Sequence, residues 1–271
     1  MDKRDSNRTA SDTERLSRRP HITVVLAMSA DGKISDAHRA PARFPSKADQ
    51  AHLERQVANA DATLFGASTL RAYGTTLSVT DKGLITERRS RQQPDQPIQI
   101  VCSATGNLDP TLRFFQQPIP RWLITTLEGM QFWQSGLHGQ LATKRSTSKP
   151  FDHILLNERP FNWHTVMQDL KVGKSALSAA ANRAPIQRLL IMGGGELVAS
   201  LLADGLVDEL YLTICPLIIG GKTAPTPVGG LGFTLPRTPQ LTLQSSRTEK
   251  DEIFLHYKIQ HSGKSQPDSA Q

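Results

Sequence analysis

Cysteine is scarce in this sequence, and patterns of metal ligands are missing. The chain has two cysteines in 271 residues, Cys102 and Cys215, and each lies in an apolar run. Thiols in such runs are typical of reduced core residues. There is no CxxC pair and no pair of histidines at the spacing of metal ligands. We therefore expect no metal site, either structural or catalytic.

Long apolar runs are also missing. No run approaches the length that a membrane span requires, and the charged N-terminal region contains no apolar signal core. From these two absences we expect a cytoplasmic protein that has no membrane partner.

Basic residues are plentiful but scattered. The net charge is +7 and the isoelectric point is about 9.6. A nucleic-acid surface usually clusters its basic residues and interleaves them with aromatic ones, and neither pattern is present. We therefore expect phosphorylated small molecules, and not nucleic acid, as the partners of this positive charge.

The composition indicates one soluble domain between two polar tails. Hydrophobic residues make up 38% of the chain and charged residues 21%. Residues 1–19 hold six Lys or Arg and four Asp or Glu, which predicts a disordered N-terminal tail. A second disordered tail is expected at 261–271. The domain then covers 20–260, with a polar insertion at about 134–149.

One glycine-rich segment is the strongest local signal. Arg188–Met192 is a short apolar run that predicts a buried strand, and the helix that follows begins near Glu196. The glycines between them, at 193–195, can bring backbone N–H groups close to an anion at the start of that helix. A tight turn without a ligand is the alternative. The segment is not a standard dinucleotide fingerprint, because the third glycine position holds Val198.

Three further loops follow predicted strands in the same way. Ser29–Lys33 follows the apolar run His21–Met28, Gly66–Arg71 follows Ala62–Phe65, and Ser103 follows Ile98–Cys102. Ligands of α/β sheets bind beyond the carboxyl ends of the strands. We therefore expect all four loops to meet at one cleft. Asp31 can serve its turn alone.

The remaining pattern predicts an α/β fold with a mixed sheet of about eight strands. Period-two alternation in Leu241–Arg247 and Ile253–Ile259 predicts an antiparallel hairpin at one edge. Helices are expected at Lys47–Ala60 and Trp163–Leu170, and Thr80–Gln96 is expected to be a loop. Ser46 and Asp49 form a variant of the capping box at the start of the first helix.

Three signatures, in order along the chain, resemble a known family. They are Ala27–Ile34, Asp61–Ala72, and Gly193–Leu197 followed by Gly205–Glu209 and Pro216–Gly221. This arrangement resembles the pyrimidine reductases of riboflavin biosynthesis, meaning the C-terminal reductase domain of the bifunctional deaminase/reductase and its stand-alone relatives. The resemblance implies a dihydrofolate-reductase-like fold, with three α/β/α layers, a mostly parallel central sheet and a C-terminal antiparallel hairpin.

The same resemblance implies a function and a set of residues. It implies a homodimer in which NADPH reduces 5-amino-6-(5-phosphoribosylamino)uracil, or its diamino-pyrimidinone analogue, at ribose C1′. Deaminase activity is not expected, because the zinc motif of the deaminase is absent. The implied catalytic residues are Lys33 and Asp31. The implied cofactor residues are Ala27, Thr69, Ser103, Gly193, Gly194, Gly195, Glu196 and Leu197. The implied substrate residues are Lys33, Arg43, Arg71 and Met192.

Several positions depart from the family pattern on the substrate side. Met192 stands where the family has Glu, Tyr73 where it has Asp, and Val57 where it has Arg. An Arg is also missing near Thr80. Two alternatives therefore stay open: a reductase of this fold for another pterin-like or carbonyl substrate, and a catalytically silent nucleotide-binding protein. Other basic residues could hold the substrate phosphate, namely Arg39, Arg43, Arg55 and Arg71.

Overall fold

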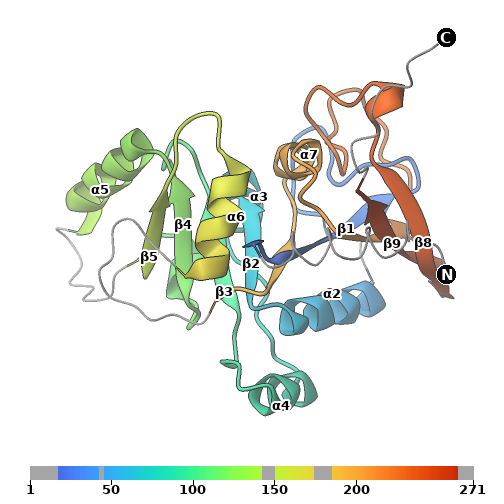
Figure 1. Ribbon diagram of the computed structural model, residues 1–271, viewed down its shortest axis with the longest axis horizontal. Coiled ribbons are helices and arrows are strands. Elements are labelled where there is room, and N and C mark those ends of the chain that lie inside the picture. Colours follow the sequence, from blue (N-terminus) through green and yellow to red (C-terminus); the bar gives the residue numbers. More distant parts are fainter. Residues whose placement is uncertain (1–17, 43–45, 142–149, 174–184, 262–271) are drawn as a thin grey trace, which may run out of the picture.

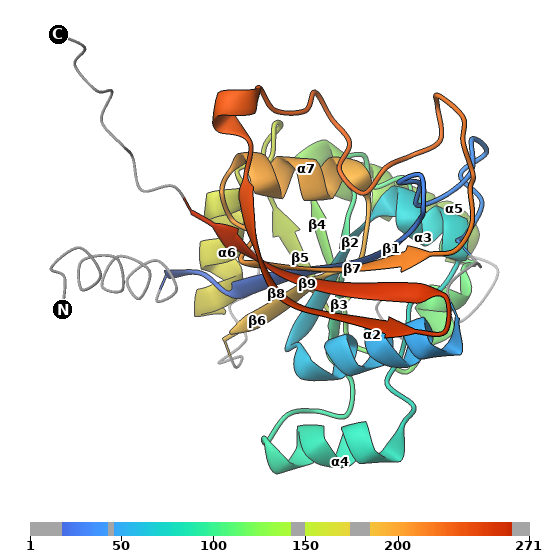
Figure 2. The ribbon, with the colours of Figure 1, turned by 90° about the vertical axis from the view of Figure 1, so that its right-hand side faces the viewer.

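The computed structural model describes residues 18–42, 46–141, 150–173 and 185–261. A mixed sheet of nine strands in the order β5-β4-β3-β2-β6-β1-β7-β9-β8 runs through these residues (Figures 1 and 2). The first seven strands in this order, from β5 to β7, pair in parallel. The last two, β9 and β8, pair antiparallel, β9 with β7 and β8 with β9. The strands are β1 (His21–Ser29), β2 (Ala62–Gly66), β3 (Ile98–Cys102), β4 (Arg121–Thr125), β5 (His153–Leu156), β6 (Arg188–Ile191), β7 (Glu209–Cys215), β8 (Gln240–Glu249) and β9 (Glu252–Gln260). The predicted fold class is confirmed.

Helices cover both faces of this sheet. Successive residues of a strand point to opposite faces, so Val24 of β1 packs in the core cluster under α6 and α7, whereas Val25 packs in the cluster under α2. Figure 2 shows α7 and α2 on opposite sides of the strands. The helices are α2 (Lys47–Asn59), α3 (Ala67–Tyr73), α4 (Lys82–Ser90), α5 (Leu127–Leu141), α6 (Trp163–Val172) and α7 (Gly195–Ala203), with short 3₁₀ helices η1 (Arg113–Gln116) and η2 (Leu235–Arg237).

The predicted hairpin occupies the end of the sheet. Its inner strand β9 pairs with β7, and its outer strand β8 pairs with β9 through a β-bulge at Leu243 and Ser245. Every residue of β8 is exposed. In β9 the buried residues are Glu252, Phe254 and Ile259, whereas Ile253 is 40% exposed. The alternation of Ile253–Ile259 therefore predicted the strand correctly but not its buried face.

The expected loop at Thr80–Gln96 is wrong, because it contains α4. Asp81 caps this helix by accepting a hydrogen bond from the backbone N–H of Leu84 at 2.9 Å. Arg88 is fully buried, and its guanidinium donates to the backbone carbonyls of Ala58 and Ala60 at 2.8 and 2.7 Å. The polar sequence therefore gave no apolar periodicity for this helix, whose buried residues are Leu84 and Arg88.

The expected insertion and tails also need correction. The part of the insertion at 134–141 completes helix α5, and 142–149 lies outside the described residues. Arg19 and His261, expected in the two tails, both bind the carboxylate of Asp208. The folded domain therefore includes both, while 1–17 and 262–271 lie outside the described residues.

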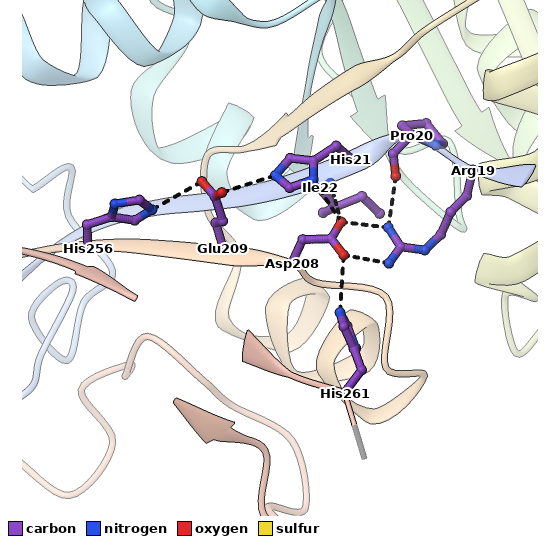
Figure 3. A network of polar contacts seen from close by, with 8 residues as sticks. All are labelled: Arg19, Pro20, His21, Ile22, Asp208, Glu209, His256 and His261. Carbon is purple, nitrogen blue, oxygen red and sulfur yellow. Dashed lines mark hydrogen bonds and ion pairs between the residues drawn. The ribbon is translucent and has the colours of Figure 1, made fainter. Parts of the chain in front are cut away.

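A polar network joins the amino ends of β1 and β7 (Figure 3). Asp208 accepts hydrogen bonds from the backbone N–H of Ile22 at 2.8 Å and from Arg19, and it contacts His261 at 3.1 Å. Glu209 lies between His21 and His256, at 3.5 and 3.1 Å. The network ties the first strand to the C-terminal hairpin, at the end of the strands opposite to their carboxyl edge.

Two negative findings concern the described residues. None of the helices seen there is long and apolar enough to cross a membrane. Within the same ranges, His, Cys, Asp and Glu side chains nowhere gather in a group of three or more that could hold a metal ion.

Candidate functional site

A cleft of about 1440 Å³ opens at the carboxyl edge of the sheet. The four strands whose end loops were expected to converge, β3, β2, β6 and β1, are neighbours in the sheet and run parallel. The helix α7 begins at this edge on one face, and α2 begins there on the other, because each helix returns antiparallel to its strand. The structure brings these predicted residues into the lining: Ala27, Lys33, Thr69, Met192, Gly193, Gly194, Gly195, Glu196 and Leu197.

The three glycines at the start of α7 are required for two different reasons. Gly193 and Gly194 have φ angles of 122° and 95°, in the region that side chains disfavour. Gly195 has an ordinary φ, but a Cβ there would lie 2.5 Å from the carbonyl oxygen of Thr226. Gly195 is therefore fixed by the segment that packs over it, whereas Gly193 and Gly194 give the turn its shape.

The segment 226–230 is fastened to the glycine turn. The backbone N–H of Gly229 donates to the carbonyl of Gly195 at 3.0 Å, and that of Gly230 donates to the carboxylate of Glu196 at 3.0 Å. Glu196 also lies in the first turn of α7, where its charge complements the helix dipole. The Thr69 hydroxyl lies 3.7 Å from the position of a Cβ on Gly193, so α3 borders the turn from the β2 side.

Lys33 reaches the cleft from a turn that closes on itself. The backbone N–H of Ser29 donates to the carbonyl of Lys33 at 2.8 Å, and the backbone N–H of Lys33 donates to the Ser29 hydroxyl at 2.9 Å. The ammonium group lies 3.4 Å from the carbonyl oxygen of Ala224. This contact places the positive charge of the turn beside the segment 222–226, which also lines the cleft.

Asp31 is engaged within the protein. Its carboxylate accepts hydrogen bonds from the Ser29 hydroxyl at 2.6 Å and from the backbone N–H groups of Ile219 and Gly220 at 3.0 and 2.6 Å. These bonds, the Ser29 hydroxyl first, lower the pKa of Asp31 to about 2. Asp31 is not among the described residues that line the cleft. Its geometry is that of a residue that holds the Lys33 turn against the segment after β7.

Two other predicted residues that the structure describes, Ser103 and Arg71, are not brought into the lining. Ser103 is buried, and its backbone N–H donates to the carbonyl of Ile124 at 3.0 Å; the preceding Cys102 lines the cleft instead. The Arg71 guanidinium donates to the carbonyl of Asn107 at 3.2 Å. Arg43 lies outside the described residues. Burial raises the pKa of the Cys102 thiol to about 12, so this cysteine is a neutral wall residue.

The sequence reading missed Asp49 as a cleft residue. The sequence predicts a capping role for Asp49, and the Ser46 hydroxyl does accept from its backbone N–H at 3.2 Å. The residue, however, is only 7% exposed, and it lines the cleft. The spacing of Asp49, Leu53 and Val57 was the available signal, because residues four apart share one helix face and Val57 is fully buried.

The geometry defines an α/β domain with a large ligand cleft at the carboxyl edge of its parallel strands. The chain matches the family model described as the RibD C-terminal domain over residues 20–255, and it belongs to that family. Its relatives include the 2,5-diamino-6-ribosylamino-4(3H)-pyrimidinone 5′-phosphate reductase of Archaeoglobus fulgidus, 28% identical over 79% of this chain and 89% of the relative. The reductase of the same name from Methanothermobacter thermautotrophicus is 25% identical over 89% of this chain and 99% of the relative.

The solved structures agree on the fold. A pyrimidine reductase-like protein from Corynebacterium diphtheriae superimposes with a TM-score of 0.70 at 19% identity, over 91% of this chain and 94% of that protein. The family expected from the three sequence signatures is confirmed by the match to the family model.

Proposed function

We propose that this protein is an NADPH-dependent reductase of riboflavin biosynthesis, which converts a phosphoribosylamino-pyrimidine into its ribitylamino form. The observation that carries the proposal is the shared cleft of the glycine turn and Lys33, in a chain whose relatives are named as reductases of such a pyrimidinone. The cleft is large enough for two ligands side by side, because ordinary small-molecule pockets measure about 300–1,000 Å³.

NADPH is assigned to the α7 side of the cleft. The first-turn N–H groups of α7 and the positive end of its dipole suit a phosphate, and the backbone can approach closely at Gly193 and Gly194. Ala27, Thr69 and Leu197 complete this half of the lining. When bound there, NADPH supplies the hydride that ribose C1′ accepts.

The substrate is assigned to the side of α2 and the Lys33 turn. Lys33, Arg39 and Lys222 are the cations among the described lining residues, and they suit the substrate phosphate and the polar groups near C1′. Met192 adds an apolar surface to the lining, and it packs against the core cluster under α2. The role of these residues is to hold C1′ close to the nicotinamide and to exclude water.

A homodimer in the cytoplasm is part of the same proposal. The free edge of β8 and the exposed side chains of Leu241, Leu243 and Ile253 form a surface of the kind that a second subunit covers. A monomer mass from light scattering at micromolar concentration would refute the dimer.

The function is tested with the purified protein, NADPH and each of the two phosphoribosylamino-pyrimidines. We expect loss of absorbance at 340 nm and formation of the ribitylamino product. Growth of a strain that lacks its own pyrimidine reductase, after introduction of this chain, is the second expected result. Binding of NADPH without reduction of either pyrimidine would favour a silent nucleotide-binding protein, and reduction of other carbonyl compounds only would favour a different substrate.

A further inference from the structure

A buried acid lies on the side of the cleft away from the glycine turn. Asp49 stands in the first turn of α2, one helical turn before Leu53, and both residues line the cleft. Leu53 and Met192 pack against the same core cluster, so Asp49 and Met192 border the same half of the cleft. Asp49 therefore faces the space assigned to the substrate.

Asp49 is the acid that this half offers. The acidic residues among the described lining are Asp49, Glu196 and Asp204. The other two belong to α7, where Glu196 holds the N–H of Gly230 and Asp204 ends the helix. A ligand group on the α2 side that seeks a carboxylate would meet Asp49.

The surroundings of Asp49 hold its carboxyl group in place. The buried Thr213 side chain of β7 is near enough to lower the pKa of this carboxyl group. The charge of Glu252 in β9 raises this pKa, and the charge of Arg247 in β8 lowers it. The charge of Asp49 in turn raises the pKa of Tyr73 in α3. Glu252 has partners of its own, because it accepts from the backbone N–H and the hydroxyl of Ser46. Burial raises the pKa of Asp49, and the opposing effects of Thr213 and Arg247 are smaller.

The two candidate pyrimidines differ at one edge of the ring. The diamino-pyrimidinone presents two donors side by side, the 2-amino group and N3–H. The uracil presents a carbonyl acceptor at C2 beside the N3–H donor. A carboxylate accepts hydrogen bonds only, so it pairs with both groups of the first edge and is repelled by the carbonyl of the second.

We propose that Asp49 is a specificity-determining residue, which binds the 2-amino and N3–H groups of the diamino-pyrimidinone and selects this substrate over the uracil. This inference rests on the proposed function and names the substrate of the same cleft. It also orders the reactions, because a chain with this preference acts before the 2-amino group is removed by a hydrolytic deamination.

The test is the substitution Asp49→Asn, which keeps the size of the side chain and changes its hydrogen bonding. The amide oxygen accepts from N3–H, and the amide nitrogen donates to a carbonyl at C2, so the variant matches the uracil edge. We expect the ratio of kcat/KM for the diamino-pyrimidinone to kcat/KM for the uracil to fall about 10- to 100-fold, the range for one charge-assisted hydrogen bond. The wild-type protein should prefer the diamino-pyrimidinone.

The matched control is Glu252→Gln, the same chemical change at the neighbouring buried carboxyl group, which is not in the described lining. It should change the substrate ratio much less than Asp49→Asn does, even if stability falls. An unchanged ratio in Asp49→Asn, or an equal change in Glu252→Gln, would overturn the assignment.

A second measurement separates this inference from the proposed function. Calorimetry measures the dissociation constants of the two ribitylamino products for both variants and for wild type. Their ratio reports the same preference without turnover. If the protein reduces neither pyrimidine but the binding ratio shifts in Asp49→Asn, the reductase function is refuted and the role of Asp49 is supported. Reduction with a binding ratio that does not shift would refute Asp49 alone, and absence of both reduction and binding would refute both.

Discussion

The guanidinium of Arg19 donates two hydrogen bonds, at 2.7 and 2.6 Å, to the carboxylate of Asp208, and the two side chains are 8% and 10% exposed. Burial by itself would raise the pKa of Asp208. The hydrogen bonds from Arg19 and His261 outweigh it and hold this pKa well below its usual range. The folded state therefore binds a proton at Asp208 less readily than the unfolded chain does.

Asp208→Asn should lower the free energy of unfolding by about 3–5 kcal/mol near neutral pH, because the change leaves Arg19 buried without its partner. The carboxylate stabilises the fold above its unfolded pKa of about 3.9, and this contribution is lost as the pH falls through the lower folded pKa. Denaturant titrations at several pH values should show the difference between wild type and variant shrinking below about pH 4. A constant difference would contradict this account. Asp95→Asn, which breaks the exposed pair with Arg89, is the control and should change little.

His21→Gln should show the opposite pH dependence. The hydrogen bond to Glu209, against the opposing effect of burial, raises the pKa of His21 above 6.5. Charged His21 therefore adds stability below the unfolded pKa, and this stability is lost as the pH rises through the higher folded pKa. Melting temperatures measured at about pH 5.5 and pH 8.5 should differ from wild type mainly at the lower pH. An equal loss at both would show that His21 contributes through packing.

Lys33→Ala should lower kcat/KM for the pyrimidine about 10- to 100-fold, because one charge-assisted contact to the substrate is removed. The dissociation constant of NADPH should stay close to wild type, since Lys33 lies on the Ala224 side of the cleft. Fluorescence titration with NADPH and initial rates separate the two effects. Loss of NADPH binding with an unchanged substrate KM would show that the division of the cleft is wrong.

Gly194→Val should weaken NADPH about tenfold or more, because the side chain strains a backbone with φ of 95° and blocks close approach to the turn. Gly205→Ala is the matched control. Gly205 also has a positive φ, of 63°, but no atom lies within 4 Å of the added Cβ. The control should lose stability and keep its NADPH affinity. Equal effects on NADPH in the two variants would remove the glycine turn from the cofactor site.

Asp31→Asn should lower the melting temperature and raise the substrate KM, because the amide cannot accept all the hydrogen bonds from Ser29, Ile219 and Gly220. Turnover at saturating substrate should be largely kept if Asp31 only holds the Lys33 turn. A collapse of kcat with an unchanged melting temperature would instead support the prediction of Asp31 as a catalytic residue.

The sequence predicted those parts of the fold that rest on local patterns. Apolar runs and period-two alternation located the strands, and the loops after β1, β2, β3 and β6 were expected at one edge, where they lie. The helix α4 could not be predicted in this way, because its buried Arg88 looks like a surface residue until the carbonyls of Ala58 and Ala60 are in place.

The site was less predictable for a similar reason. The roles of Asp31 and Gly195 depend on segments far along the chain, at 219–220 and at Thr226. The capping motif at Ser46 accounts for Asp49 by a local contact, so nothing in it indicates a side chain in the cleft. Contacts between distant segments leave no local signature, whereas the glycine turn does.

The position of β1 has a consequence for synthesis of the protein. Of the nine strands that the structure describes, β1 is synthesised first, yet its two sheet neighbours, β6 and β7, begin only at Arg188 and Glu209. The apolar residues of β1 therefore stay without their sheet neighbours until β6 and β7 have been translated, at about 5–20 residues per second. We expect truncated nascent chains that end before Arg188 to depend on chaperones, and release from them to coincide with emergence of the segment up to Cys215.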